Sequence, residues 1–439
     1  MGQGSPVSKT ANNSFAMTNS FSTRKGKHSV RLIGQYVSYQ INVYAPGSIA
    51  GSFSFDTGLT SLPGINDTGH AFASFLLGLP SAASISLTAS PSYYRNQYGL
   101  VALRESYEVR KNLTVSLALD LMTTTPRVEK YDRQSTVDLS TLNPENGLPG
   151  ALIAAGRNGV GRSFQPIYTK LQPSASFAWN PGGNTKTVVR GNFGRSYSGY
   201  PIYATQWGTQ AFNGTPNWNS VNSQLEPVLL LSNGLPSLPS YPNTSPAAIN
   251  NMYADLFDRS HRQPTYQSAS VSVERELPAS MLFSLTAAYS GGKSMYVGDG
   301  SANPNAIPLS ALSYRDQLND DNFRRTVRPY PQYRGFSTYA NYPVGRYERN
   351  AAIFRLEKRT SRGLSLTATY EWAKQMDNYS GPYGTQDFYN LSKEWSLTPG
   401  SNAHRISMNY LYELPLGPNR TFFTFPDWRR YLIAGWSIS

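Results

Sequence analysis

Apolar and polar residues alternate in segments of about ten residues, and such segments recur along nearly the whole chain. In residues 113–121 the apolar positions are Leu113, Val115, Leu117, Leu119 and Leu121, separated by Thr114, Ser116, Ala118 and Asp120. Residues 364–372 alternate in the same way, from Leu364 to Trp372. A helix would need apolar residues about every 3.6 positions, and none of these segments has that spacing. The pattern predicts an all-β chain of antiparallel strands, each with one apolar face.

Further segments show the same period of two, some of them weakly. They lie at residues 30–36, 98–102, 171–179, 269–273, 283–289, 352–356 and 406–414. Over the whole chain we expect about twelve strands, and the segments named here, with the two above, are the ones in which the alternation can be read. Residues 71–79 (AFASFLLGL) predict a short helix inside a loop.

The connections between these segments are of two kinds. Short turns are expected at residues 110–112, 180–184, 277–280 and 359–363, and long polar links at roughly 139–166, 198–265, 299–345 and 377–401. Soluble domains seldom carry several structureless loops of that length. Short turns at one end and long loops at the other are typical of outer-membrane barrels, in which they face the periplasm and the cell exterior. We therefore predict an antiparallel transmembrane β-barrel.

The side chains at strand ends and on the second face are compatible with this fold. Tyr and Trp gather near strand ends, at Tyr93, Tyr94, Trp179, Tyr197, Tyr289, Tyr370, Trp372, Tyr410 and Tyr412. Such rings form girdles at a membrane interface, although each one alone is also an ordinary strand residue. The face opposite the apolar positions carries Glu274, Arg355, Glu357, Glu371 and Glu413. These residues fit a water-filled lumen or, in a soluble sandwich, an exposed face.

Composition excludes several other classes of protein. The chain has 439 residues, no Cys and a net charge of +13. Without Cys there are no disulfides and no thiolate chemistry. The basic residues are scattered and do not form the patch that nucleic acid requires, so we expect no nucleic-acid partner. An anionic membrane surface or an anionic cargo suits such scattered charge better.

The usual signatures of catalysis and of cofactor binding are missing from the sequence. The four histidines, His28, His70, His261 and His404, do not have the spacing of a metal pair. The glycines of residues 156–161 (GRNGVG) do not have dinucleotide-binding spacing. The acidic stretch at residues 316–322 (DQLNDDN) invites a calcium interpretation but lacks the glycine and the final glutamate of an EF-hand. We expect no enzyme activity and no cofactor, and leave open a loop calcium site.

The long loops are rich in aromatic residues. Candidates for contact with a cargo molecule are Tyr203, Trp207, Trp218, Tyr330 and Tyr333. Aromatic rings with amide neighbours can stack on sugars or grip peptides. The alternative, to which we give more weight, is that these rings pack the loops together over the barrel mouth.

A series of short blocks resembles the TonB-dependent transporters of the Oar-like outer-membrane barrel group. The blocks are FLLGLP at 75–80, the strands at 98–109 and 113–121, YDR at 131–133, QPSASFAW at 172–179, NTKTVVRGNFG at 184–194, ERELP at 274–278, AYSGGK at 288–293, RPYPQY at 328–333, LSLTATYEWAKQMDN at 364–378, His404 with Arg405, YELPLG at 412–417 and GWSIS at 435–439. Each block is weak alone, but their order covers nearly the whole chain. One departure lies in residues 98–107, where the group carries acidic residues and a Trp, and this chain has Arg104, Glu105 and Tyr107.

The resemblance implies a place in the outer membrane, with contacts to lipid and lipopolysaccharide and energy supplied by the TonB complex. Family members also have a signal peptide, a TonB-contacting segment and a plug inside a barrel of about 22 strands. We recognise none of those parts here, because Met1 precedes GQGSPVSKTANNS without an apolar run and Ser439 falls in what looks like mid-strand. Residues 1–439 are therefore expected to be an incomplete barrel portion, from a split gene or a truncated gene model.

Three functions remain open on the sequence alone. The first is a TonB-dependent transporter whose extracellular loops bind an unknown cargo. The second is an outer-membrane adhesin or surface-binding barrel without transport. The third is a secreted soluble β protein that binds carbohydrate.

Overall fold

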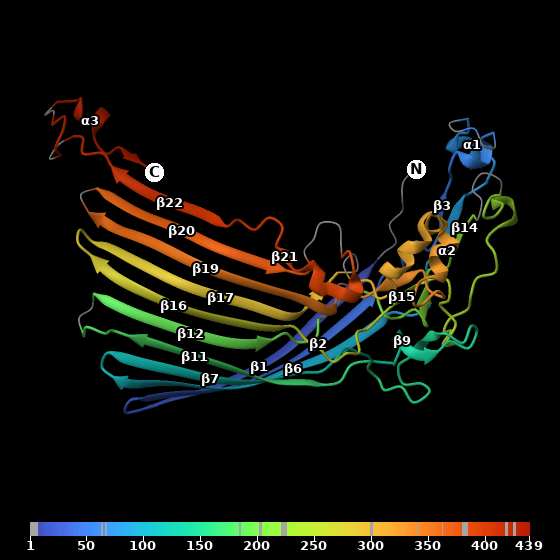
Figure 1. The fold of residues 1–439 in the computed structure, drawn as a ribbon, viewed down its shortest axis with the longest axis horizontal. Coiled ribbons are helices and arrows are strands. Elements are labelled where there is room, and N and C mark those ends of the chain that lie inside the picture. The colour runs from blue at the N-terminus through green and yellow to red at the C-terminus, as the bar shows by residue number, and fades with distance from the viewer. Residues whose placement is uncertain are drawn as a thin grey trace.

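One antiparallel sheet runs through the chain, and its strands follow the order of the sequence (Figure 1). The computed structural model describes residues 8–62, 65, 68–183, 186–201, 204–220, 226–298, 302–339, 341–361, 363–379, 385–417, 420–424 and 427–439. The path of the sheet is β1 (Lys9–Lys25), β2 (His28–Tyr44), β6 (Ser92–Arg110), β7 (Leu113–Thr124), β11 (Tyr168–Trp179), β12 (Thr187–Tyr197), β16 (Thr265–Leu277), β17 (Met281–Val297), β19 (Tyr342–Ser361), β20 (Leu364–Asp377), β22 (His404–Glu413) and β23 (Ser437–Ile438). Two short strands, β8 (Val128–Glu129) and β21 (Ser396–Leu397), pair beside this path. The all-β antiparallel fold with about twelve main strands is confirmed.

The sheet, hereafter the wall, is curled and open. Its two edges are β1 and β23, and among the described residues no pairing joins them. All 17 residues of β1 are exposed, as are nine of the ten residues of β22. The wall is therefore an arc of a barrel with two bare edges.

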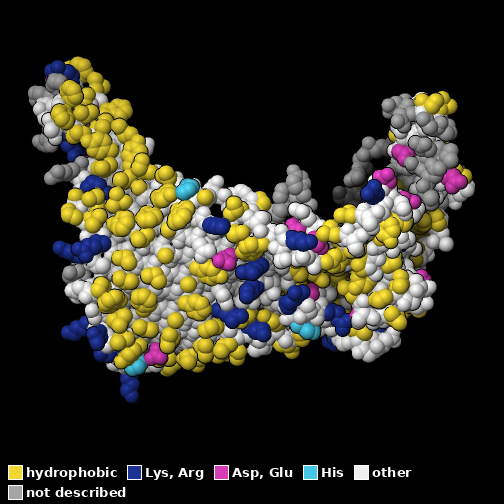
Figure 2. All heavy atoms as spheres, viewed as in Figure 1, with side chains coloured by type: hydrophobic (Ala, Val, Ile, Leu, Met, Phe, Trp, Pro, Cys, Tyr) yellow, Lys and Arg dark blue, Asp and Glu magenta, His cyan; other side chains and the backbone are white. Residues whose placement is uncertain are grey.

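The strand register gives the wall two chemically different faces. Direct partners on adjacent antiparallel strands share a face, and one such row joins Leu117, Ala175, Phe193, Ala269, Tyr289, Asn350 and Lys374 across seven strands. The face of this row, hereafter the outward face, exposes large apolar side chains, such as Val271 at 51% and Ile406 at 79%. Figure 2 shows apolar side chains covering much of the visible wall.

The opposite, inward face is polar. It carries the ion pairs Arg104–Asp120 at 3.1 Å, Arg190–Glu274 at 3.5 Å, Arg349–Glu371 at 2.5 Å and Arg355–Glu357 at 3.1 Å. The carboxylates expected on the second face thus lie where the alternation placed them.

The two ends of the wall differ as the connection lengths predicted. The four expected short turns join β6 to β7, β11 to β12, β16 to β17 and β19 to β20, all at one end. The long links leave the other end, at the right of Figure 1, and include a fifth at residues 45–91. The described residues of 414–436, which include α3 (Arg430–Ile433), belong to a longer link at the short-turn end.

The long links contain short elements of their own. They are β3 (Ser52–Ser54), η1 (Gly58–Thr60), α1 (Ala71–Leu76), β4 (Ala82–Ser84), β5 (Leu87–Thr88), β9 (Ser135–Leu142), β10 (Pro149–Ala154), β13 (Asn213–Gly214), β14 (Asn217–Asn219), η2 (Leu231–Asn233), β15 (Tyr253–Asp255), η3 (Leu309–Asn319), α2 (Asp321–Thr326), β18 (Gly335–Ser337) and η4 (Phe388–Glu394). The helix α1 confirms the prediction for residues 71–79. In the described parts of the chain, no helix combines the length and the apolar character needed to span a membrane.

The strand β1 lies outside the predicted segments, because Asn13 and Asn19 interrupt the alternation of its larger apolar residues. The predicted position of one aromatic residue was wrong. Tyr94 does not join an exposed girdle at a strand end, since only 1% of it is exposed. It packs against Ile41 and Val43 where β6 enters the long links.

Candidate functional site

The long links pack on one another to form a continuous body, hereafter the loop layer. It comprises the described residues of 45–91, 125–167, 198–264, 298–341 and 378–403. Its core is a cluster of Val137, Leu152, Ala154, Ala211, Phe212, Ile249, Ala254, Leu256, Tyr333 and Phe336, drawn from three of the links. Because these links bury their own apolar residues, they form a folded unit above the end of the wall.

Backbone pairing between distant links supports this core. The hairpin of β9 and β10 comes from one link, whereas β15 and β18 come from two links and pair in parallel. Beside this pair, the Tyr333 side chain is fully buried, and its hydroxyl donates a hydrogen bond to the Gly150 carbonyl oxygen at 3.1 Å. Tyr333 therefore lies inside the layer and ties the link at 298–341 to the link at 125–167.

A second anchor surrounds Arg127. Its guanidinium lies 4.0 Å from the ring centroid of Tyr94, 5.5 Å from that of Trp207 and 5.2 Å from that of Phe257. Its Nε donates to Gln134 Oε1 at 3.0 Å. Desolvated cation–π contacts of this kind contribute about 2 kcal/mol. Trp207 thus helps to fix the loop layer to the start of β6.

A third anchor is the fully buried carboxylate of Glu129. It accepts hydrogen bonds from the backbone nitrogens of Tyr93, Tyr131 and Arg133, and from the Arg133 guanidinium, at 2.7 to 3.0 Å. Burial by itself would raise the pKa of Glu129, but these hydrogen bonds favour the charged form and hold the pKa below its ordinary value. The YDR block is therefore a turn wrapped around one buried carboxylate.

The remaining candidate aromatics are distributed as follows. Trp218 is half-buried in β14, opposite Ala83 of β4. Tyr330 is also half-buried and packs edge-on against Phe336, with ring centroids 5.5 Å apart. Tyr203 lies outside the described residues. The structure does not bring the described candidates together around one cavity, and their contact with cargo stays a prediction.

Sequence reasoning missed a cleft in the loop layer with a volume of about 400 Å³. It lies between the β9–β10 hairpin and residues 156–161, and includes Asp138, Arg157, Asn158 and Arg259. A cavity of this size is within the range of small-ligand sites. Gly156 and Gly159 have positive φ values of 68° and 79°, so the glycines dismissed as a nucleotide motif form the turn that borders the cleft.

The charges of the cleft are partly paired. Arg259 and Asp138 form an ion pair at 2.5 Å. Burial would raise the pKa of Asp138, but hydrogen bonds from Ser140 and from the Arg259 guanidinium lower it to about 2. The Arg157 guanidinium stacks over Phe212 at 4.9 Å. The cleft therefore offers guanidinium groups, amides and one fixed carboxylate to a polar ligand.

The acidic stretch at residues 316–322 has structural uses that its sequence did not reveal. The Asp320 side chain caps α2 by accepting from the Asn322 backbone nitrogen at 2.8 Å. Asp321 forms an ion pair with Arg324. Within the described ranges, no group of three or more His, Cys, Asp or Glu side chains is arranged to hold a metal ion.

Comparisons with known proteins identify the fold family. A model of the family described as "outer membrane beta barrel domain" matches residues 1–439. None of the curated proteins matches the chain.

Several solved structures are similar at low identity. They include the FrpB iron transporter from Neisseria meningitidis in its apoprotein form, with 9% identity, a TM-score of 0.41 and 92% of this chain covered. The ferric-catecholate import receptor Fiu from K12 E. coli has 10% identity, a TM-score of 0.39 and 93% coverage. The alcaligin outer-membrane receptor FauA from Bordetella pertussis has 9% identity, a TM-score of 0.37 and 93% coverage. The chain spans 42%, 42% and 44% of these three proteins, respectively.

Proposed function

Because the chain belongs to the outer membrane β-barrel domain family, we propose that it forms part of the wall and the cell-surface loops of a TonB-dependent transporter of the Oar-like group. The protein resides in the cell outer membrane. The observation that carries the proposal is the loop layer, a packed body with its own cleft at one end of a wall with a charged inner face. A barrel that only anchors a protein in the membrane has no need of such a body.

The orientation follows from the connections. In bacterial outer-membrane barrels short turns face the periplasm and long loops face the exterior. The loop layer would then meet cargo first, and the inward ion pairs would line the path to the periplasm. Cargo would contact the cleft beside Arg157 and Arg259 and the half-buried rings of Trp218 and Tyr330.

The two unpaired edges of the wall need partner strands. Unpaired strand edges cannot lie in hydrocarbon, because their backbone groups would lose their hydrogen bonds. We propose that further strands join β1 and β23 to close the barrel, and that a plug and a TonB-contacting segment belong to the complete transporter. The chain then supplies the wall and loops, and the energy-coupled movement lies in the other parts.

The test is uptake by cells that carry the gene with its adjoining coding sequence. A panel of labelled ferric siderophores, oligosaccharides and oligopeptides is offered to wild-type and deletion strains, with and without a protonophore. A transporter accumulates at least one probe in an energy-dependent manner, and the deletion abolishes this accumulation. Surface retention that the protonophore does not change would support an adhesin instead. The soluble carbohydrate-binding alternative is wrong, because the chain belongs to an outer-membrane family.

A further inference from the structure

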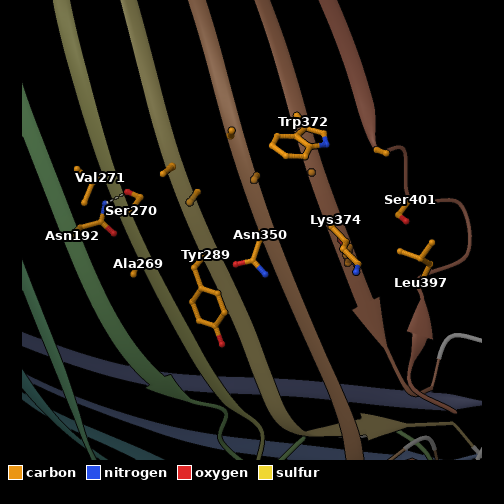
Figure 3. Close-up of a pocket in the computed structure, with 17 residues that line it drawn as sticks. Asn192, Ala269, Ser270, Val271, Tyr289, Asn350, Trp372, Lys374, Leu397 and Ser401 are labelled. Carbon is orange, nitrogen blue, oxygen red and sulfur yellow. Dashed lines mark hydrogen bonds between the residues drawn. The ribbon is translucent and has the colours of Figure 1, made fainter. Parts of the chain in front are cut away.

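Two hollows of the described chain differ in what surrounds them. A shallow groove of about 890 Å³ lies on the outward face of the wall, beside Ala269, Tyr289 and Trp372 (Figure 3). Its surface is mostly apolar and, in the orientation given above, it meets lipid. The cleft of the loop layer, with a volume of about 400 Å³, belongs instead to the end of the protein that meets the external solution. A water-soluble ligand therefore reaches the cleft and not the groove.

The cleft contains one guanidinium that no described carboxylate neutralises. Arg157 Nη1 donates long hydrogen bonds to the backbone oxygens of Asp132 and Ala155, both at 3.4 Å. Its Nε and Nη2 donate to none of the described residues, and neither atom is shut off from solvent. The charge of Arg259, in contrast, is balanced by Asp138. The net charge that the cleft presents to a ligand is therefore that of Arg157.

The local structure holds this guanidinium in place before any ligand arrives. The backbone nitrogen of Gly156 donates to the Gly161 oxygen at 3.1 Å, which closes the turn that carries Arg157. The guanidinium stacks over the ring of Phe212, a member of the loop-layer core, at 4.9 Å from the ring centroid. A side chain that is already ordered loses little conformational freedom when it binds an anion.

The neutral part of the lining combines hydroxyl groups with apolar side chains. These residues are Thr141, Ser163 and Thr244, and Ile153, Val160 and Phe164. A sugar ring presents hydroxyl groups at its rim and C–H groups on its two faces, so both kinds of lining group have a counterpart on it. The volume of the cleft is at the small end of the range for ligand pockets and suits roughly two sugar rings.

We propose that the cleft binds an acidic sugar of one or two rings, with a uronate carboxylate held by Nε and Nη2 of Arg157. Arginine binds a planar carboxylate through two parallel N–H···O bonds, which a single ammonium group cannot reproduce. The sugar rings lie against Val160 and Phe164, and their hydroxyls exchange hydrogen bonds with Thr141 and Thr244. The inference rests on the proposed function, because it names the class of cargo that the same cleft would take.

The test uses the full gene product, purified from outer membranes in mild detergent. Binding of digalacturonate, of dimannuronate and of a disaccharide of glucuronate and N-acetylglucosamine is measured by titration calorimetry. The methyl ester of each sugar is the matched probe without charge. We expect at least one acid to bind, and its ester to bind at least about ten-fold more weakly, because hydrogen bonds to charged groups are the stronger ones.

Variants of Arg157 separate its charge from its paired donors. Arg157→Gln should weaken binding of the acid by at least about ten-fold and leave binding of the ester unchanged. Arg157→Lys keeps the charge but not the planar pair of donors, and should recover only part of the affinity. Lys374→Ala removes an exposed cation beside the outward groove and should leave binding unchanged (Figure 3). Unchanged hydrogen exchange of β10 shows that the loop layer of each variant is folded.

Three results would overturn the inference. They are binding of none of the acids, equal binding of acid and ester by the wild-type protein, and a loss with Lys374→Ala equal to that with Arg157→Gln. Energy-dependent uptake of a different probe, found together with any of these results, would leave the proposed function standing. Acid-specific binding that Arg157→Gln abolishes, in cells that take up no probe, would support the inference and count against transport.

Discussion

In most proteins the strands are buried and the loops that join them are exposed, but in this chain the wall is exposed and the loop layer is buried. Every residue of β1 is exposed, whereas Val137 and Tyr333 in the loop layer have 0% exposure. The loop layer forms its own apolar core, and the wall leaves its large apolar side chains uncovered on one face. The difference indicates that a surrounding lipid phase must complete the wall, while the loop layer is stabilised by its own contacts.

The largest effect is expected inside the loop layer. Tyr333→Ala removes a fully buried ring and its hydrogen bond to Gly150, and should cost about 3–5 kcal/mol of local stability. Hydrogen exchange of β10 and β15 measures this loss. Leu117→Ala on the outward face should cost about 1 kcal/mol or less, because lipid contacts the site in the folded protein and replaces the lost packing. Equal losses of stability for Tyr333→Ala and Leu117→Ala would contradict the difference between the loop layer and the wall.

Placing an arginine on the outward or on the inward face of the same strand tests which face of the wall meets lipid. Val271 and Ser272 are neighbours on β16 with opposite faces. Val271→Arg places a guanidinium in lipid and should cost about 2–4 kcal/mol if the site is near the bilayer midplane, whereas Ser272→Arg, toward the lumen, should cost about 1 kcal/mol or less. Urea unfolding in lipid vesicles measures both. A larger cost for Ser272→Arg would mean that the assigned faces are inverted.

The buried carboxylate of the loop layer predicts an intermediate effect. Glu129→Gln keeps the shape but loses the charge that accepts four hydrogen bonds, and should cost about 2–3 kcal/mol. Limited proteolysis of residues 125–167 reports the loosened anchor. Arg133→Lys serves as a control, because it keeps a positive charge beside the carboxylate and leaves the backbone donors in place. Its cost should be clearly smaller.

Acid should loosen the loop layer before the wall. The folded pKa values of Glu129 and Asp138 are lowered, so their contribution to stability is present above their ordinary values and is lost as pH falls through the folded ones. For Asp138 this range runs from 3.8 to about 2. Exchange protection of the β9–β10 hairpin should therefore hold at neutral pH and fall through this range. Protection that fell between pH 8 and 6 would show that another group controls the layer.

The smallest effect is expected for an exposed ion pair on the inward face. Arg355 and Glu357 lie 3.1 Å apart, with side chains 52% and 37% exposed. Exposed pairs contribute about 0–1 kcal/mol, so Arg355→Ala should change wall stability by no more than that. The same urea titration measures it. A loss comparable to that of Tyr333→Ala would mean that the inward pairs, and not the lipid, hold the wall together.

The wall was predictable from the sequence because its information is local. Period-two alternation placed Leu117 outward and Glu371 inward, and the short turns set the strand pairing. Strand lengths were underestimated, since β19 and β6 continue past the membrane-spanning length toward the loop layer. In those extensions both faces meet protein or water, so the alternation fades.

The packing of the loop layer and the position of its cleft could not be predicted from the sequence, for a physical reason. Arg259 pairs with Asp138 across 121 residues, and no local period marks such a contact. Tyr333 had the correct residue type for ligand contact, but its burial depends on the other links.

The most direct test of the account is a scan of lipid contact along β16. The chain has no Cys, so single cysteines at residues 269–274 can each carry a nitroxide label. Collision rates with oxygen and with a water-soluble nickel complex are then compared in lipid vesicles. The account predicts that positions 269, 271 and 273 favour oxygen and that positions 270, 272 and 274 favour nickel. The same preference at all six positions, or the reverse alternation, would contradict a wall with one face in lipid and the other in a wet lumen.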